Sequence, residues 1–113
     1  AIALGTNNSS LTAISNDYTF NDVFAREIMA LGKPEDVFVG ISTSGNSENV
    51  IRAVRTANDM GLKVYCLTGQ TGGLLKEQAE CICVPSMITA RIQEAHILIG
   101  HIVCELVEQT FVK

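Results

Sequence analysis

The 113-residue sequence has no tryptophan, only two prolines and two histidines, and no excess of basic residues. Its net charge of −4 gives no positive surface of the kind that general nucleic-acid or anionic-membrane binding needs. The apolar runs fall far short of the roughly 20 residues of a membrane span, and the opening Ala-Ile-Ala-Leu-Gly lacks the basic region of a signal peptide. We therefore expect no nucleic-acid partner and no membrane association.

The four cysteines, Cys66, Cys81, Cys83 and Cys104, are scattered along the chain. Buried free cysteine behaves as a small hydrophobe, so we favour free thiols in a reducing compartment over disulfides or a metal cluster. Cys81 and Cys83 could share one face of a strand, but no second cysteine pair accompanies them. With 47% apolar and 18% charged residues, the composition predicts one packed globular domain in the cytoplasm.

Apolar runs alternate with helical patterns along the chain. Val37, Phe38, Val39 and Ile41 show no polar alternation, which indicates a strand covered on both faces in a parallel sheet. The expected strands are residues 1–4, 37–42, 63–68 and 81–84, and the expected helices are 20–31, 47–60, 74–79 and 89–112, with a helical turn at 11–14. Short connections imply right-handed crossovers, so we predict an α/β fold with a parallel sheet flanked by helices.

A cluster of hydroxyl side chains follows the second expected strand. Ser42, Thr43, Ser44 and Ser47 surround Gly45 directly before a helix, and we call residues 42–47 the serine loop. A helix N-terminus presents unpaired N–H groups and partial positive charge, which suits a phosphate. The absence of a lysine argues against a nucleotide-binding P-loop. The plainer alternative is an ordinary polar turn in which Ser47 only caps the helix.

Two further turns are expected at the same edge of the sheet. Asn16 and Asp17 follow the first expected strand and its helical turn, and residues 68–73 follow the third strand. Ligands of open parallel sheets bind at the carboxyl ends of the strands, so the three turns together favour a ligand site there. Asp17 is equally well explained as the cap of the helix that follows it.

Several stretches, in order along nearly the whole chain, carry a family resemblance. Gly-Ile-Ser-Thr-Ser-Gly-Asn-Ser at residues 40–47 resembles the phosphosugar-binding loop of SIS (sugar isomerase) domains. Residues 1–4 with 13–17, residues 67–73, and Ala-Arg-Ile-Gln-Glu-Ala-His at 90–96 with His101 are similar to phosphoheptose isomerases. The resemblance implies a three-layer, flavodoxin-like SIS domain over residues 1–113. It also implies that the family's first strand and N-terminal helices are lacking and that the chain alone is nearly inactive.

The resemblance also implies an activity. Phosphoheptose isomerases convert sedoheptulose 7-phosphate to D-glycero-D-manno-heptose 7-phosphate through an enediol, in heptose biosynthesis. By the same resemblance His101 is the catalytic acid/base, and Gln93 and His101 hold Zn²⁺. The implied substrate-binding residues are Asn16, Asp17, Ser42, Thr43, Ser44, Ser47 and Gln93. A second catalytic group, a glutamate, belongs to the segment that this chain lacks.

The geometry of the last expected helix limits this assignment. Gln93 and His101 are eight residues apart, or roughly 12 Å along a helix axis, whereas zinc bonds are only about 2 Å long. Either Gln93 lies on a distorted first turn of the helix or the ligands come from two subunits. We favour a site completed by a neighbouring subunit, and a homo-oligomer (dimer or tetramer) with shared active sites. The helix is apolar on most of its circumference, which is typical of a helix buried either in the domain core or at a subunit interface. His96 is expected to be a satisfied core residue, and Arg91 to pair with Glu94.

Two other functions fit the same pattern. A non-catalytic adaptor, like SIS-domain relatives that associate with the DnaA initiator, would keep the fold without needing zinc. A sugar-phosphate-sensing domain would explain the serine loop but not Gln93 and His101.

Overall fold

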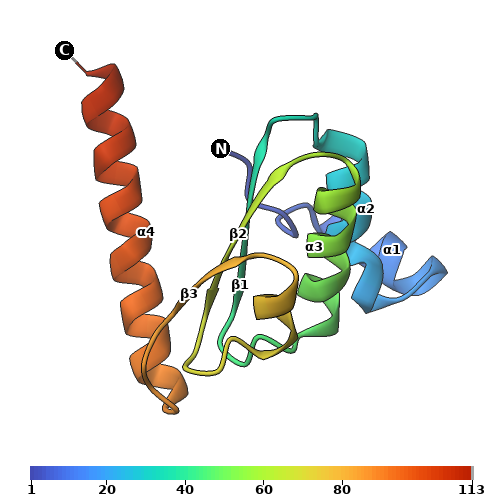
Figure 1. Ribbon diagram of the computed structural model, residues 1–113. Helices are drawn as coiled ribbons and strands as arrows, with labels where there is room; N and C mark the ends of the chain where they lie inside the picture. Colours follow the sequence, from blue (N-terminus) through green and yellow to red (C-terminus); the bar gives the residue numbers. More distant parts are fainter. Residues whose placement is uncertain (113) are drawn as a thin grey trace.

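A computed structural model describes residues 1–112 (Figure 1). The elements in chain order are α1 (Asn8–Asp17), the 3₁₀ turn η1 (Phe20–Asp22), α2 (Val23–Leu31), β1 (Val37–Ser42), α3 (Glu48–Asp59), β2 (Lys63–Thr68), the 3₁₀ turn η2 (Gly73–Glu77), β3 (Glu80–Cys83) and α4 (Thr89–Phe111).

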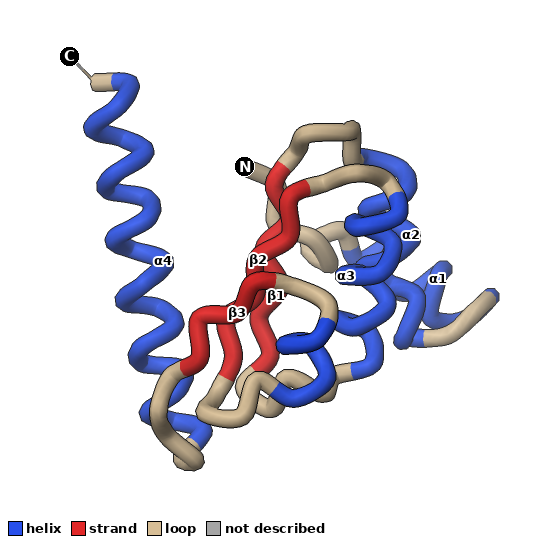
Figure 2. The backbone as a smooth tube through the Cα atoms, in the orientation of Figure 1, coloured by secondary structure: helices blue, strands red, loops and turns tan. Residues whose placement is uncertain are grey.

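The strands form one parallel sheet in the order β1-β2-β3. Val37 of β1 lies opposite Lys63 of β2, and Tyr65 of β2 lies opposite Glu80 of β3. Helices flank the sheet, with α1–α3 on one side and α4 on the other (Figures 1 and 2). The predicted α/β class is confirmed, and β1, β2 and α3 fall within one residue of the predicted bounds.

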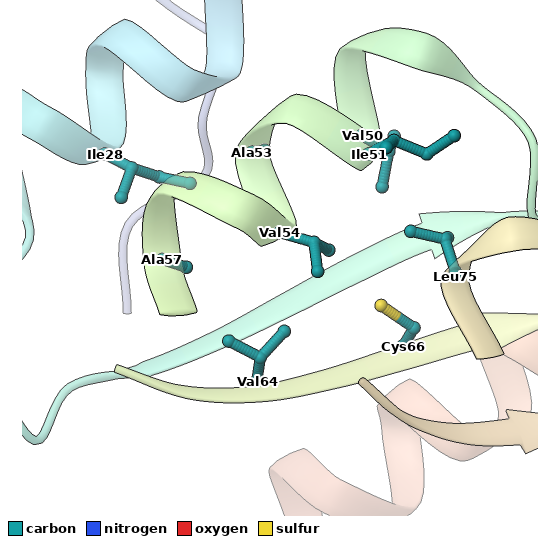
Figure 3. Packing of buried hydrophobic residues seen from close by; sticks show 9 residues of the cluster. All are labelled: Ile28, Val50, Ile51, Ala53, Val54, Ala57, Val64, Cys66 and Leu75. Carbon is teal, nitrogen blue, oxygen red and sulfur yellow. The ribbon is translucent and has the colours of Figure 1, made fainter. Parts of the chain in front are cut away.

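The core lies between one face of the sheet and helices α2 and α3 (Figure 3). Along α3 the buried positions recur three and four residues apart, so one stripe of the helix faces the sheet. The cluster consists of Ile28, Val50, Ile51, Ala53, Val54, Ala57, Val64, Cys66 and Leu75. This packing fixes the carboxyl end of β1 directly before the first turn of α3.

The opposite face of β1 is exposed, so the prediction that both faces are covered is wrong. Val37, Val39 and Ile41 are 58%, 52% and 58% exposed, whereas Gly40 and Ser42 between and after them are buried. The strand therefore alternates by burial although its sequence does not alternate by polarity. The reason is tertiary, because no described helix covers this face of β1.

Residues 1–4 do not form the predicted strand. A groove of about 740 Å³ lies between them and β1 and is lined mainly by apolar side chains, among them Ile2, Leu4 and Phe38. A strand needs a neighbouring backbone to pair with, and the sheet of residues 1–112 contains only β1, β2 and β3. The segment is tied to α2 instead, because the Gly5 amide donates to Glu27 Oε2 at 2.6 Å.

Helix α1 is longer than the predicted turn at residues 11–14. Asn7 Oδ1 accepts hydrogen bonds from the amides of Ser9 and Ser10 at 3.0 and 3.1 Å, which starts the helix at Asn8. The signal in the sequence was this capping asparagine rather than apolar periodicity, because no residue of α1 is buried.

Helix α4 is largely exposed in the single chain, so it is not buried in the domain core, and burial at a subunit interface stays a prediction. Ile92 and His96 are its buried residues, and both lie in its first two turns. Beyond them the helix extends away from the sheet (Figure 1) and exposes Ile97, Leu98, Ile102, Val103, Leu106, Val107 and Phe111. None of the helices in residues 1–112 is long and apolar enough to cross a membrane.

Candidate functional site

The hydroxyls of the serine loop converge at the carboxyl end of β1. Ser42 Oγ lies 2.9 Å from Ser47 Oγ and 3.4 Å from Ser44 Oγ. Ser44 Oγ also accepts a hydrogen bond from the Asn46 amide at 3.1 Å. Ser42 is only 5% exposed, so it supports the more exposed hydroxyls from below.

Ser47 occupies the N-cap position of α3, but its side chain makes no capping hydrogen bond. Its hydroxyl hydrogen-bonds to the Ser42 hydroxyl instead. The alternative that Ser47 only caps the helix is therefore right about the position of Ser47, but Ser47 makes no capping hydrogen bond. A helix N-terminus without a side-chain cap leaves amide donors for another partner. The partial positive charge of the helix end makes an anion the favoured partner.

A second loop packs closely against the serine loop, and we call residues 69–73 the glycine loop. The Leu75 amide donates to Gly45 O at 3.1 Å, and the Leu74 amide donates to Asn46 Oδ1 at 2.9 Å. Gly45 has φ +68°, and a Cβ there would lie 2.1 Å from Gly72 O. The predicted convergence of these two turns is therefore confirmed, and a glycine at position 45 makes it possible.

A cavity of about 280 Å³ opens beside the two loops. It is lined by Thr43, Ser44, Gln70, Thr71, Ser86, Met87, Thr89 and Ile92. None of these side chains carries a charge, so the lining offers neutral hydroxyl and amide groups. The larger groove beside residues 1–4 is mainly apolar and lies away from the serine loop, so we regard the smaller cavity as the candidate site.

Sequence reasoning missed two of the polar lining residues, Ser86 and Thr89, whereas Gln70 and Thr71 lie in the predicted turn at residues 68–73. The positions of Ser86 and Thr89 carried a usable signal, since they follow the carboxyl end of β3 as Thr43 and Ser44 follow that of β1. In a parallel sheet these ends share one edge. The loop after β3 was not among the predicted turns.

Asn16 and Asp17 are the last residues of α1 and are exposed. Asn16 Nδ2 donates to Asp17 Oδ1 at 2.9 Å, and no hydrogen bond within residues 1–112 joins either side chain to the serine loop. Asp17 does not cap the next helical turn, because Thr19 Oγ1 accepts from the Asn21 amide there. The capping alternative for Asp17 is therefore wrong.

Gln93 and His101 lie on α4, exposed and outside the cavity. His101 is 12 residues beyond Thr89, which is roughly 18 Å along the helix. Within residues 1–112 no three His, Cys, Asp or Glu side chains are grouped so that they could hold a metal ion. One amide and one imidazole do not make the four-ligand set that zinc takes, so this chain's residues do not by themselves fit a zinc site.

The nearby arginines are already paired. Arg52 donates to Asp22 at 2.7 Å and to Glu48 at 2.9 Å, and these hydrogen bonds raise the pKa of the Arg52 guanidinium. Arg91 pairs with Glu94 as predicted. An anion at the serine loop would therefore be held by hydroxyls and backbone amides rather than by these two charges.

Comparison with known proteins gives the family. The family profile described as "SIS domain" matches residues 1–69, which include β1, the serine loop and β2. The chain belongs to the SIS domain family. It is 55% identical over 111 residues to a phosphoheptose isomerase of Roseiflexus sp. (strain RS-1) and 52% identical over 112 residues to one of Helicobacter pylori (strain P12).

The predicted likeness to phosphoheptose isomerases is confirmed by these relatives and by solved structures. This SIS domain superposes on a phosphoheptose isomerase of Neisseria gonorrhoeae with a TM-score of 0.91 at 49% identity, covering 95% of this chain and 61% of that one. It superposes on a phosphoheptose isomerase of Francisella tularensis with a TM-score of 0.92 at 42% identity, covering 96% of this chain and 59% of that one. The two matches to Roseiflexus and Helicobacter cover 97% and 98% of this chain, which spans only 56% and 58% of those proteins.

Proposed function

We propose that this SIS domain binds the substrate of a phosphoheptose isomerase, an enzyme that interconverts sedoheptulose 7-phosphate and D-glycero-D-manno-heptose 7-phosphate. The observation that carries the proposal is the hydroxyl cluster of Ser42, Ser44 and Ser47 beside an uncapped helix N-terminus. The identity of more than 50% to proteins of that name supports the same substrate class.

The phosphate would be bound by neutral donors. Ser42, Thr43, Ser44 and Ser47 supply hydroxyls, and the first turn of α3 supplies N–H groups and partial positive charge. Hydrogen bonds to a charged acceptor are worth roughly 1.5–3 kcal/mol each, so several of them suffice without a lysine or arginine. In this proposal Asn16, Asp17 and Gln93 contact the sugar chain.

The reaction moves a proton between two adjacent carbons of the sugar through an enediol. It needs an acid/base pair placed on the two carbons, together with donors that stabilise the developing oxyanion. We assign His101 to this acid/base role, as the likeness to phosphoheptose isomerases implies. A second acid/base group, expected as a glutamate, is not assigned within this chain.

His101 would serve a cavity other than that of its own chain. It lies roughly 18 Å along α4 from Thr89, which lines the cavity. We therefore propose a homo-oligomer, a dimer or tetramer, in which α4 of one copy reaches the site of another. The exposed apolar side chains of α4, such as Leu98, Ile102 and Leu106, support a second copy as the partner.

Zinc binding stays a prediction. Gln93 and His101 would each supply one donor from this chain, and the other ligands would come from outside residues 1–112. The cytoplasm stays the proposed compartment, since all four cysteines are free thiols and free thiols persist in reducing surroundings.

Ligand-induced stabilisation tests the proposal. We expect sedoheptulose 7-phosphate, but not fructose 6-phosphate at the same concentration, to raise the free energy of unfolding. The rise should reach about 2.7 kcal/mol at a ligand concentration 100 times Kd. Ser44→Ala should weaken the effect, whereas Ser9→Ala, an exposed serine of α1, is the matched control and should leave it unchanged.

The same measurement is repeated with added zinc, to separate the isomerase from the non-catalytic adaptor and the sugar-phosphate-sensing domain. Stabilisation by neither sugar phosphate, with or without zinc, would contradict the proposal and favour the non-catalytic adaptor. Equal stabilisation by both sugars would contradict the assigned substrate.

A further inference from the structure

One peptide group connects three parts of the molecule. The carbonyl of Thr68 accepts hydrogen bonds from the Val84 amide and from His96 Nε2, both at 3.0 Å. In the same peptide unit the Gly69 amide donates to Thr43 O at 2.9 Å. The Thr68–Gly69 peptide therefore links α4 and the residue after β3 to the backbone of the serine loop.

His96 is 5% exposed, and its hydrogen bond sets the protonation of Nε2. Because a carbonyl only accepts, Nε2 must carry a proton to make this bond. Nδ1 is buried and has no hydrogen-bond partner within the described residues. An apolar side chain would avoid this unpaired atom, so packing alone does not explain a histidine here. What the imidazole adds is the bond to Thr68.

The contact between α4 and the two loops is tight at the same place. A Cβ on Gly69 would lie 2.5 Å from Thr43 O and 2.7 Å from Ile92 Cδ1. Ile92 and His96 are the buried residues of α4, one turn apart, so the helix is held at this point. A displacement of α4 must therefore move Gly69, and Gly69 holds Thr43.

We propose that His96 is a positioning residue that couples the placement of α4 to the conformation of the serine loop through the Thr68–Gly69 peptide. The coupling makes the loop's phosphate-binding shape depend on the helix that carries Gln93 and His101. The coupling itself needs no ligand, whereas its effect on sugar-phosphate affinity rests on the proposed function.

Two substitutions at His96 test the hydrogen bond separately from packing. His96→Gln keeps an N–H donor at similar reach, whereas His96→Met is apolar and cannot donate. Val54→Ala is the matched control, because it removes buried atoms of the core on α3 without touching the peptide. The readouts are the backbone amide NMR resonances of Gly69 and residues 43–45, and the Kd for sedoheptulose 7-phosphate.

We expect His96→Met to shift the Gly69 and serine-loop amides and to weaken sedoheptulose 7-phosphate binding by about tenfold, the size of one lost hydrogen bond. His96→Gln should restore both readouts to within about threefold of the wild type in Kd. Val54→Ala should lower stability but leave the Gly69 amide and the Kd unchanged.

The proposal is overturned if His96→Met leaves these amides in place, or if Gln and Met weaken binding equally. Wild-type protein that binds no sugar phosphate would refute the proposed function, while the amide resonances still decide the coupling. Should His96→Met fail to fold, the imidazole ¹⁵N spectrum of the wild type provides the decision. A proton on Nε2 supports the proposal, and a proton on Nδ1 with a bare Nε2 overturns it.

Discussion

Gly45→Ala is the substitution that best probes the contact between the serine loop and the glycine loop. Gly45 has φ +68°, where an alanine costs about 1 kcal/mol more than glycine. The new Cβ would lie 2.1 Å from Gly72 O and 2.8 Å from the Gly73 amide nitrogen, so one backbone must move. That movement breaks the hydrogen bond from the Leu75 amide to Gly45 O.

The free energy of unfolding should fall by about 3 kcal/mol in Gly45→Ala. About 1 kcal/mol comes from the positive φ, and the remainder comes from the displaced loop and from one or two lost hydrogen bonds of roughly 1 kcal/mol each. Gly61→Ala is the matched control, because Gly61 has φ +79° and no atom within 4 Å of its added Cβ. Gly61→Ala should lower the free energy of unfolding only by the cost of an alanine at positive φ, about 1 kcal/mol.

Urea unfolding followed by far-ultraviolet circular dichroism measures both variants, which suits a chain without tryptophan. Affinity for sedoheptulose 7-phosphate should fall in Gly45→Ala and stay unchanged in Gly61→Ala, since only the first displaces the serine loop. Equal losses of stability in the two variants would refute the reasoning, because the close approach of the two loops would then contribute nothing.

Three further outcomes are expected. Ser42→Ala leaves the Ser47 hydroxyl without its 2.9 Å partner, so unfolding free energy should fall by about 1 kcal/mol and sedoheptulose 7-phosphate affinity should fall with it; an unchanged affinity in calorimetry would count against the phosphate site. Burial, and then the charge of Cys81, raises the pKa of the Cys66 thiol to about 11 from 9.0. As the pH rises, the Cys66 thiol therefore ionises in the unfolded chain before it ionises in the folded chain. The contribution of the protonated Cys66 thiol to the free energy of unfolding is complete below pH 9 and is lost between pH 9 and 11, at up to about 1.4 kcal/mol per pH unit. Urea titrations at several pH values should show a shallower decline in Cys66→Ala, and an identical decline would contradict the assignment. Leu106→Glu should abolish concentration-dependent self-association in sedimentation equilibrium and change monomer stability by no more than about 0.5 kcal/mol; unchanged association would refute α4 as the interface.

Local pattern was sufficient where one short segment contained its own signals. The apolar runs before Ser42 and Thr68 predicted β1 and β2, and the periodic apolar residues of α3 with Gly61 behind them predicted that helix. Local pattern failed where the secondary structure of a segment depends on a neighbouring segment. Residues 1–4 have the composition of a strand but pair with no strand of residues 1–112, and they lie across a groove from β1.

The candidate site shows the same division. The hydroxyls of the serine loop could be predicted because they follow a strand and precede a helix within six residues. Ser86 and Thr89 could be placed only at the edge where β3 ends, since their nearness to Thr43 depends on how three loops fold over that edge of the sheet. His96 had to be read as an ordinary core residue, because its hydrogen bond to Thr68 spans 28 positions.

The sequence by itself determined the α/β class, the position of the serine loop and the family likeness, because each depends on residues close together along the chain. Only the tertiary structure decided which face of β1 is covered, that α4 is exposed beyond His96, and that Gly69 lies between Thr43 and Ile92. Burial and long-range hydrogen bonds belong to pairs of distant segments, and a pattern read along one segment does not contain its partner.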